Sequence, residues 1–440
     1  MPMSFIDGST LYRQHYFSLP LSYSKQGYSK QSDSKPDSEH IQVFARELVD
    51  VNKDQQDLPW LVYFQGGPGF QSPRASGESG WLKRALQEYR VLLLDQRGTG
   101  NSSAVNQESL AHLSPEEQAE YLTHFRADNI VRDAEAIRVQ LGIEKWATLG
   151  QSFGGFCTLT YLSLFPESLL RCYVTGGIPS IARHADDVYQ ATYQRVIDKN
   201  QAFFAQFPQA QQLCGDIAQF LSENEVTLPN GQKFSVEQFQ LIGINLGRGN
   251  ANLPLYYLLE SAFVEVNGTK QLSYAFLNQM QQEQSYLTNP IYAILHESIY
   301  CQGDASKWSA HRVRQQYPRF NYQAGQDFWF TGEMVFPWMF DELDTLKSLR
   351  AAAHLLAEKS DWGELYNADV LSRNTVPVAC AVYADDMYVE FDYSRETLAT
   401  IPMSKAWITN EYEHNGIGVD GENILDRLIA MADALDHLPK

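Results

Sequence analysis

Residues 150–155 read Gly-Gln-Ser-Phe-Gly-Gly, and they lie between a run typical of a buried strand (residues 145–150) and a run typical of a helix that ends near Phe165. Gly-x-Ser-x-Gly in this strand–turn–helix context puts a serine in a tight turn, from which its hydroxyl projects above a sheet. The glycines two before and two after the serine remove side chains that would clash there. The following helix directs its N–H groups at the same point. The stretch therefore predicts that Ser152 is a nucleophile on an α/β fold.

The neighbouring segments continue the α/β pattern in both directions. Residues 128–141 place apolar side chains at helical spacing, which predicts an amphipathic helix. Continuous apolar runs, typical of strands that are buried on both faces, occur at residues 59–65 and 90–95, and further strands are expected at residues 145–150 and 171–176. Strands that alternate with helices in this way predict a mostly parallel sheet with helices on both faces.

A long insertion interrupts this pattern after Pro179. It shows helical patterns, many glutamines and many aromatic residues, but few buried strand runs. Strand-like runs and a last amphipathic helix return after it, at residues 376–384, 403–409 and 421–435. We therefore expect an α/β catalytic domain made of residues 1–179 and 347–440, and a large, mainly helical cap (lid) domain made of residues 180–346.

Composition and charge exclude several classes of protein. The chain has 440 residues, of which 44% are hydrophobic, and this excludes disorder over most of its length. Its formal net charge of −19 argues against nucleic acid or an anionic membrane as the main partner, because both would repel it. No window reaches about 18 apolar residues, and the N-terminus lacks the basic and apolar regions of a secretory signal. We expect a cytoplasmic enzyme.

The cysteines and the other metal-binding residue types predict no metal site. The five cysteines are an odd number, and no two of them form a Cys-x-x-Cys unit. This pattern favours single buried thiols over disulfides or a zinc site. No cluster of His, Asp or Glu has ligand spacing either, so we expect no metal and no cofactor.

A serine nucleophile needs a histidine base and an acid, and in this fold the acid follows the serine and the histidine comes last. The acid is expected after a late strand, where both Asp385 and Asp386 lie. The histidine is expected in the loop after the last strand, where His414 lies. His414 would take the proton from Ser152 and return it to the leaving group, and the aspartate would orient the imidazole. On these grounds both aspartates are candidates.

Two backbone N–H groups are expected to stabilise the negative oxygen that develops during acyl transfer. One is the N–H of Phe153, directly after the serine. The other belongs to the glycine-rich loop at residues 65–69 (QGGPG), after an early buried strand, and we assign it to Gly67. Glycines in that loop let the backbone approach the developing anion.

Together, these motifs resemble the proline iminopeptidase (prolyl aminopeptidase) family of α/β-hydrolase serine peptidases. The resemblance rests on GGPGF at residues 66–70, DQRGTGNS at 95–102, GQSFGG at 150–155, YADDMYV at 383–389 and EHNG at 413–416. The long cap is similar to that of the larger bacterial type, so the resemblance covers nearly the whole chain. It selects Asp386 as the acid, with Asp385 second. The chain departs from the family at Gln65, where members commonly have histidine.

The resemblance implies an enzyme that releases an N-terminal residue, usually proline, from peptides. In this family acidic cap residues recognise the free N-terminal amine, and Glu297 (in HESIYCQG) and Glu333 (in FTGEMVFPWMF) are the matching candidates. Aromatic residues between 328 and 338 either line a pocket for the pyrrolidine ring or form the core of the cap, and we favour the core. For Arg97, in the DQRG motif, we favour a bracing role over a binding one.

Two other functions are open on the sequence. The first is a small-molecule esterase or amidase that uses the same triad, because this fold supports many chemistries. The second is a catalytically silent binding module. Such a module should have lost a member of the triad, whereas every position is filled here.

Overall fold

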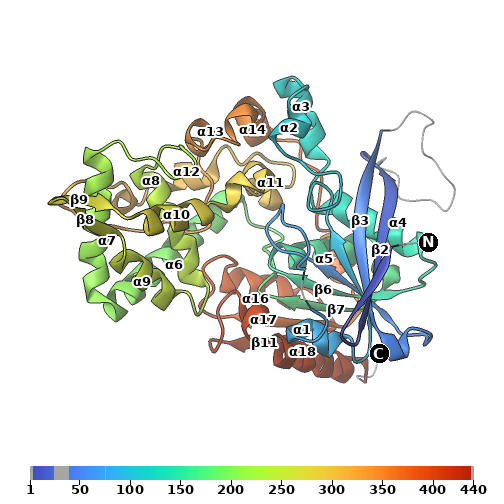
Figure 1. The fold of residues 1–440 in the computed structure, drawn as a ribbon. Coiled ribbons are helices and arrows are strands. Elements are labelled where there is room, and N and C mark those ends of the chain that lie inside the picture. The colour runs from blue at the N-terminus through green and yellow to red at the C-terminus, as the bar shows by residue number, and fades with distance from the viewer. Residues whose placement is uncertain (1–2, 24–38, 75, 438–440) are drawn as a thin grey trace.

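The computed structural model describes residues 3–23, 39–74 and 76–437, and one nine-stranded sheet forms its centre (Figure 1). The strands lie in the order β1-β2-β3-β5-β4-β6-β7-β10-β11. Neighbours pair in parallel from β5 to β11, and β1, β2, β3 and β5 pair antiparallel. The strands are β1 (Ser4–Asp7), β2 (Thr10–Pro20), β3 (His40–Asp50), β4 (Trp60–Phe64), β5 (Arg90–Asp95), β6 (Trp146–Gln151), β7 (Leu169–Thr175), β10 (Val378–Tyr383) and β11 (Ser404–Thr409). The predicted, mostly parallel sheet is confirmed.

Alternate side chains of the central strands enter two separate hydrophobic cores. In β4, Val62 and Phe64 belong to the first core, and Leu61 and Tyr63 belong to the second. A strand whose two faces are both covered has no polar face. This is why β4 and the middle of β5 (residues 91–94) are apolar.

Helices cover both faces of the sheet, as the sequence predicted. The apolar stripes of α4 and α5 pack in the first core, and those of α1 and α18 pack in the second. In Figure 1, α1 and α18 lie side by side on one face of the sheet. The helices outside the predicted cap are α1 (Gly80–Ala85), α2 (Gln107–Leu110), α3 (Pro115–Thr123), α4 (Ala127–Gln140), α5 (Phe153–Leu164), α14 (Arg350–Glu358), α15 (Ala368–Leu371), α16 (Phe391–Ala399), α17 (Gly416–Val419) and α18 (Gly421–Asp436).

The segment predicted as the cap is mainly helical. Its helices are α6 (Ala185–Gln206), α7 (Pro208–Glu223), α8 (Val236–Gln240), α9 (Asn252–Glu260), α10 (Tyr274–Gln282), α11 (Pro290–Ile294), α12 (Ser309–Arg314) and α13 (Met339–Glu342). It also holds a hairpin of β8 (Phe263–Val266) and β9 (Thr269–Leu272). The sequence did not predict this hairpin, because most of its side chains are exposed and give no buried run.

The predicted domain division stays a prediction, and three observations bear on it. Within the described part of the chain, residues 180–346 contribute no strand to the central sheet. Figure 1 shows the green and yellow helices α6 to α10 gathered away from β2 and β3. The first core, however, runs without a break from Val62 in the sheet to Phe239 in the predicted cap. The two parts therefore share one hydrophobic core.

Two expectations from composition can be compared with the structure. All five cysteines are free and buried, as predicted. Among the described residues, no helix is both long enough and apolar enough to cross a membrane.

Candidate active site

Ser152 lies in the turn between β6 and α5 with a backbone φ of 56° and ψ of −126°. A positive φ is uncommon for any residue other than glycine, and it stores strain in the turn. The Ser152 N–H donates to the carbonyl oxygen of Thr175 at 3.0 Å, which ties the turn to the end of β7. The strained turn expected between a strand and a helix is therefore present.

Three glycines let the backbone close around this turn. A Cβ on Gly154 would lie 1.9 Å from the carbonyl oxygen of Phe64 in β4. A Cβ on Gly150 would lie 2.2 Å from the carbonyl oxygen of Gly154, and one on Gly155 would lie 2.2 Å from that of Gly177. No side chain fits at such distances, so these positions require glycine for close packing of helix α5 on the sheet.

His414 and Asp386 form a buried hydrogen-bonded pair. His414 Nδ1 lies 2.7 Å from Asp386 Oδ2, and the Asp386 side chain is only 2% exposed. The other carboxylate oxygen, Oδ1, accepts the N–H groups of Tyr388 at 2.8 Å and Val389 at 3.1 Å. The neighbouring Asp385 is exposed. Of the two aspartates that the sequence left open, it is thus Asp386 that contacts the histidine.

The surroundings of His414 favour its protonated form. Burial lowers the pKa of His414, but the charge and hydrogen bond of Asp386 raise it more, so that the pKa lies above its ordinary value of 6.5. The carboxylate of Glu333 also raises this pKa, and the guanidinium of Arg248 opposes it. Only the neutral imidazole can act as a general base, so the raised pKa bears on the pH range of this chemistry.

Ser152 and His414 approach the same short segment after β7. The Ser152 N–H donates to Thr175, and a Cβ on the next residue, Gly176, would lie 3.2 Å from His414 Nδ1. The serine turn and the His–Asp pair therefore meet beyond the carboxyl ends of β6, β7 and β10. This edge of a parallel sheet is where open α/β folds bind their ligands.

The GGPGF loop, residues 66–70, follows β4 and lies against the serine turn. A Cβ on Gly66 would lie 2.9 Å from Ser152 Cβ. This loop carries Gly67, the predicted oxyanion donor. Phe153, the other predicted donor, is the first residue of α5, and an N–H at this position has no partner within its own helix.

The cap meets this loop through α11 and Glu333. A Cβ on Gly69 would lie 2.8 Å from the backbone nitrogen of Tyr292, so α11 touches the loop. The Tyr292 ring lies edge-on to Phe70 with centroids 4.8 Å apart, and its hydroxyl donates to Glu333 Oε1. The Glu333 side chain is 14% exposed. Since its charge also raises the pKa of His414, Glu333 lies within electrostatic reach of the His–Asp pair.

Glu297 has different surroundings. Its Oε2 accepts the N–H of Ser309 at 3.0 Å, and its Oε1 accepts the N–H of Ala310 at 2.9 Å. These are the first N–H groups of α12, so the carboxylate caps this helix. Burial raises the pKa of Glu297 even though these hydrogen bonds oppose the shift. Both oxygens of Glu297 are engaged within the cap.

The aromatic residues around Glu333 are not those that the sequence singled out. Phe328, Phe330 and Phe336 are buried in the first core, as the core interpretation predicted. Tyr292 instead contacts Glu333, although 41 positions separate the two in the chain. No periodicity links residues at such a separation, so sequence reasoning had no signal for this contact.

Arg97 is fully buried and has structural partners. Its guanidinium donates to both carboxylate oxygens of Asp133, at 2.7 and 2.6 Å, and to three backbone carbonyls. None of these partners is one of the predicted site residues. The bracing role favoured from the sequence agrees with this geometry.

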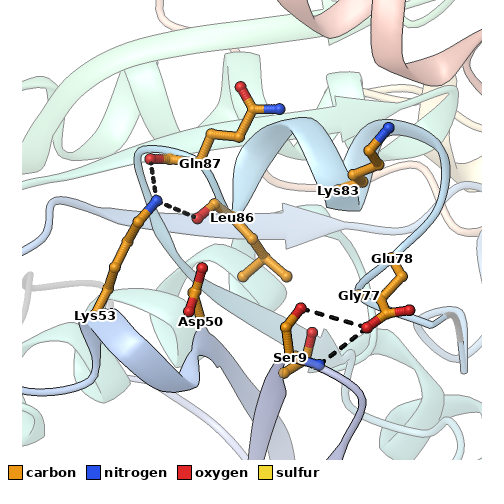
Figure 2. Close-up of a pocket in the computed structure, with 9 residues that line it drawn as sticks. Ser9, Asp50, Lys53, Gly77, Glu78, Lys83, Leu86 and Gln87 are labelled. Carbon is orange, nitrogen blue, oxygen red and sulfur yellow. Dashed lines mark hydrogen bonds between the residues drawn. The ribbon is translucent and has the colours of Figure 1, made fainter.

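Surface pockets elsewhere contain none of the predicted site residues. One pocket, of about 430 Å³, lies among β2, the turn at Val51–Lys53 and α1 (Figure 2). There Lys53 donates to the carbonyl of Gln87, and Glu78 accepts the N–H of Ser9, so these polar groups satisfy one another. A second pocket is lined by residues of α3 and α14. The described residues hold no group of three or more His, Cys, Asp or Glu side chains able to bind a metal ion.

The chain is similar to known proteins over most of its length. Residues 59–331 match the family described as alpha/beta hydrolase fold. The chain is 58% identical to a proline iminopeptidase of Aeromonas sobria, over 95% of each chain. It is 34% identical to the proline iminopeptidase aneH of Aspergillus aculeatus, over 95% of this chain and 92% of the relative. A solved hydrolase of Pseudomonas aeruginosa aligns over 89% of this chain and 95% of its own, at 11% identity and a TM-score of 0.41. The resemblance found in the sequence motifs is thus confirmed, and the chain belongs to the proline iminopeptidase family of α/β hydrolases.

Proposed function

We propose that the protein is a serine aminopeptidase that releases N-terminal proline from peptides through an acyl-enzyme. The observation that carries the proposal is the buried pair of His414 Nδ1 and Asp386 Oδ2, 2.7 Å apart, beside the strained turn of Ser152. The two near-full-length relatives named proline iminopeptidase support the same reaction.

In the proposed reaction, Ser152 Oγ attacks the carbonyl carbon of the N-terminal proline while His414 Nε2 takes the hydroxyl proton. The C–N bond to the next residue then breaks, and His414 gives the proton to the leaving amine. Water attacks the prolyl ester in the same way and releases free proline. Asp386 holds the imidazole in the required tautomer, because its Oδ2 accepts from Nδ1.

The negative oxygen of each tetrahedral intermediate is assigned to the N–H groups of Gly67 and Phe153. The contact between Gly66 and the serine turn supports this assignment, because it places the loop next to the reacting atom. The N–H of Phe153 also stands at the positive end of the α5 dipole. Donors held in this way stabilise the intermediate without reorganisation.

For the substrate amine we assign the main role to Glu333 and a structural role to Glu297. Glu333 is partly exposed where the cap meets the GGPGF loop, whereas both oxygens of Glu297 cap α12. A carboxylate about 4 Å from an ammonium group, at an effective dielectric constant near 20, contributes about 4 kcal/mol of Coulomb attraction before desolvation is subtracted. This attraction distinguishes a free N-terminus from a blocked one.

We also propose that residues 180–346 act as a lid over the catalytic domain formed by residues 1–179 and 347–440. The contact of α11 with the GGPGF loop supports this, since it brings the insertion to the edge of the sheet where Ser152 lies. The cytoplasmic location stays a prediction, and the five free, buried cysteines suit a reducing compartment.

Steady-state kinetics on three reporters test the proposal: prolyl-2-naphthylamide, N-acetyl-prolyl-2-naphthylamide and p-nitrophenyl acetate. We expect cleavage of the first and refusal of the second, which lacks the positive charge and carries extra bulk. Equal rates on the two prolyl reporters would favour the esterase or amidase function instead. If no reporter is cleaved and a fluorophosphonate fails to label Ser152, the protein is a silent binding module.

A further inference from the structure

His296 is a buried side chain whose polar atoms have no hydrogen-bond partner among the described residues. The residue is 1% exposed, and neither Nδ1 nor Nε2 makes a hydrogen bond there. A buried polar group left unpaired costs about 1–3 kcal/mol. Such a group in a native fold calls for an explanation, and an absent ligand is one of them.

His296 approaches the proposed amine-binding carboxylate of Glu333. His296 Nε2 lies 3.9 Å from Glu333 Oε2, which is beyond hydrogen-bond distance. The other oxygen, Oε1, is occupied by the hydroxyl of Tyr292, whose ring lies edge-on to His296 with centroids 5.4 Å apart. Tyr300 is also edge-on to the imidazole, at 6.5 Å. Glu333 Oε2 and His296 Nε2 therefore face each other inside an aromatic frame.

One nitrogen to the side of the line that joins these two atoms can bond to both. An N–H donor lies about 2.9 Å from its acceptor, and two such bonds from one nitrogen span the 3.9 Å gap as a bent bridge. Burial lowers the pKa of His296, and the opposing effect of Glu333 does not restore it. The imidazole is therefore neutral and offers one acceptor nitrogen.

We propose that His296 is an amine-binding residue that shares the substrate nitrogen with Glu333. A protonated N-terminal proline has two N–H bonds: one is donated to Glu333 Oε2 and the other to His296 Nε2. The pair supplies one negative charge and one neutral acceptor, which match one cation with two donors. An acylated proline nitrogen has neither N–H nor charge, so it loses both contacts. The inference rests on the proposed function and adds a second acceptor to its amine site.

The test substitutes His296→Phe, which keeps a ring of similar shape and removes both nitrogens. The matched control is His112→Phe, the same change at an exposed position outside the site. A hydrogen bond to a charged group contributes about 1.5–3 kcal/mol, so His296→Phe should raise KM for prolyl-2-naphthylamide by about 10- to 100-fold. The increase should be larger than any change in KM for p-nitrophenyl acetate, which has no amine. His112→Phe should leave both values unchanged.

A second variant, His296→Gln, keeps a side-chain acceptor and should recover part of the lost affinity. It also carries the test if His296→Phe does not fold, because the comparison is then between Gln and wild type on the two reporters. If the ratio of KM for prolyl-2-naphthylamide to KM for p-nitrophenyl acetate is unchanged in the folded variants, the inference is overturned. This includes the case in which KM rises equally for both reporters, since His296 would then have a structural role. Failure of wild-type enzyme to cleave prolyl-2-naphthylamide would instead refute the proposed function.

Discussion

Replacing Asp386 by Asn changes one atom of the His–Asp pair and leaves its size unaltered. In the native pair, Oδ1 accepts the N–H groups of Tyr388 and Val389, and Oδ2 accepts from His414 Nδ1 at 2.7 Å. The asparagine oxygen can keep the two backbone N–H groups, which directs its NH₂ group at Nδ1. The imidazole must then accept at Nδ1 and carry its proton on Nε2, so that it cannot take a proton from Ser152.

The expected loss is large and confined to turnover. In a triad of this type the wrong tautomer lowers kcat by about 10⁴-fold, which corresponds to about 5 kcal/mol in the activation barrier. The backbone contacts of Oδ1 are retained, so the melting temperature should change little. The assay is kcat on prolyl-2-naphthylamide, with Asp385→Asn as the matched control, because that side chain is exposed.

Two results would refute this reasoning. One is an Asp386→Asn enzyme that keeps more than a few per cent of wild-type kcat. The other is a larger loss for Asp385→Asn than for Asp386→Asn in folded proteins, which would make Asp385 the partner of His414 in solution.

Three further predictions follow from the site. Ser152→Ala should fold normally and lose nearly all hydrolysis of prolyl-2-naphthylamide, because no other group forms the acyl-enzyme; residual turnover of more than a few per cent, free of contaminating enzyme, would exclude the serine mechanism. Glu333→Gln should raise KM for prolyl substrates strongly. Glu297→Gln should mainly lower the free energy of unfolding, by about 1–3 kcal/mol, because one N–H of α12 loses its acceptor. A raised KM for Glu297→Gln together with a lowered stability for Glu333→Gln would assign the amine-binding role to Glu297. Because the pKa of His414 is raised and only the neutral imidazole is a base, kcat/KM should fall as the pH drops through a value above 6.5. Glu333→Gln should move this acidic limb of the pH profile to lower pH, because it removes a charge that raises the pKa of His414. An acidic limb that stays in place would contradict the electrostatic effect of Glu333 on His414.

The sequence by itself determined the elements that local patterns encode. The run at residues 90–95 is strand β5, and the predicted helix at residues 128–141 is α4 within one residue at each end. These predictions succeed because burial on both faces of a sheet, or along one face of a helix, imposes a period that neighbouring residues display. The turn at Ser152 was also predictable from local sequence, since its glycines lie within three positions of it.

Only the tertiary structure decided which distant side chains meet. Asp385 and Asp386 are adjacent in the chain and chemically identical, and the direction of each side chain after β10 leaves one exposed and aims the other at His414. Likewise, Glu297 and Glu333 are each the one acidic residue of their cap segments, HESIYCQG and FTGEMVFPWMF. Their difference depends on partners far along the chain: backbone N–H groups of α12 for Glu297, and Tyr292 for Glu333. Contacts of this kind have no period in the sequence, because they arise where the loops and the cap pack together in three dimensions.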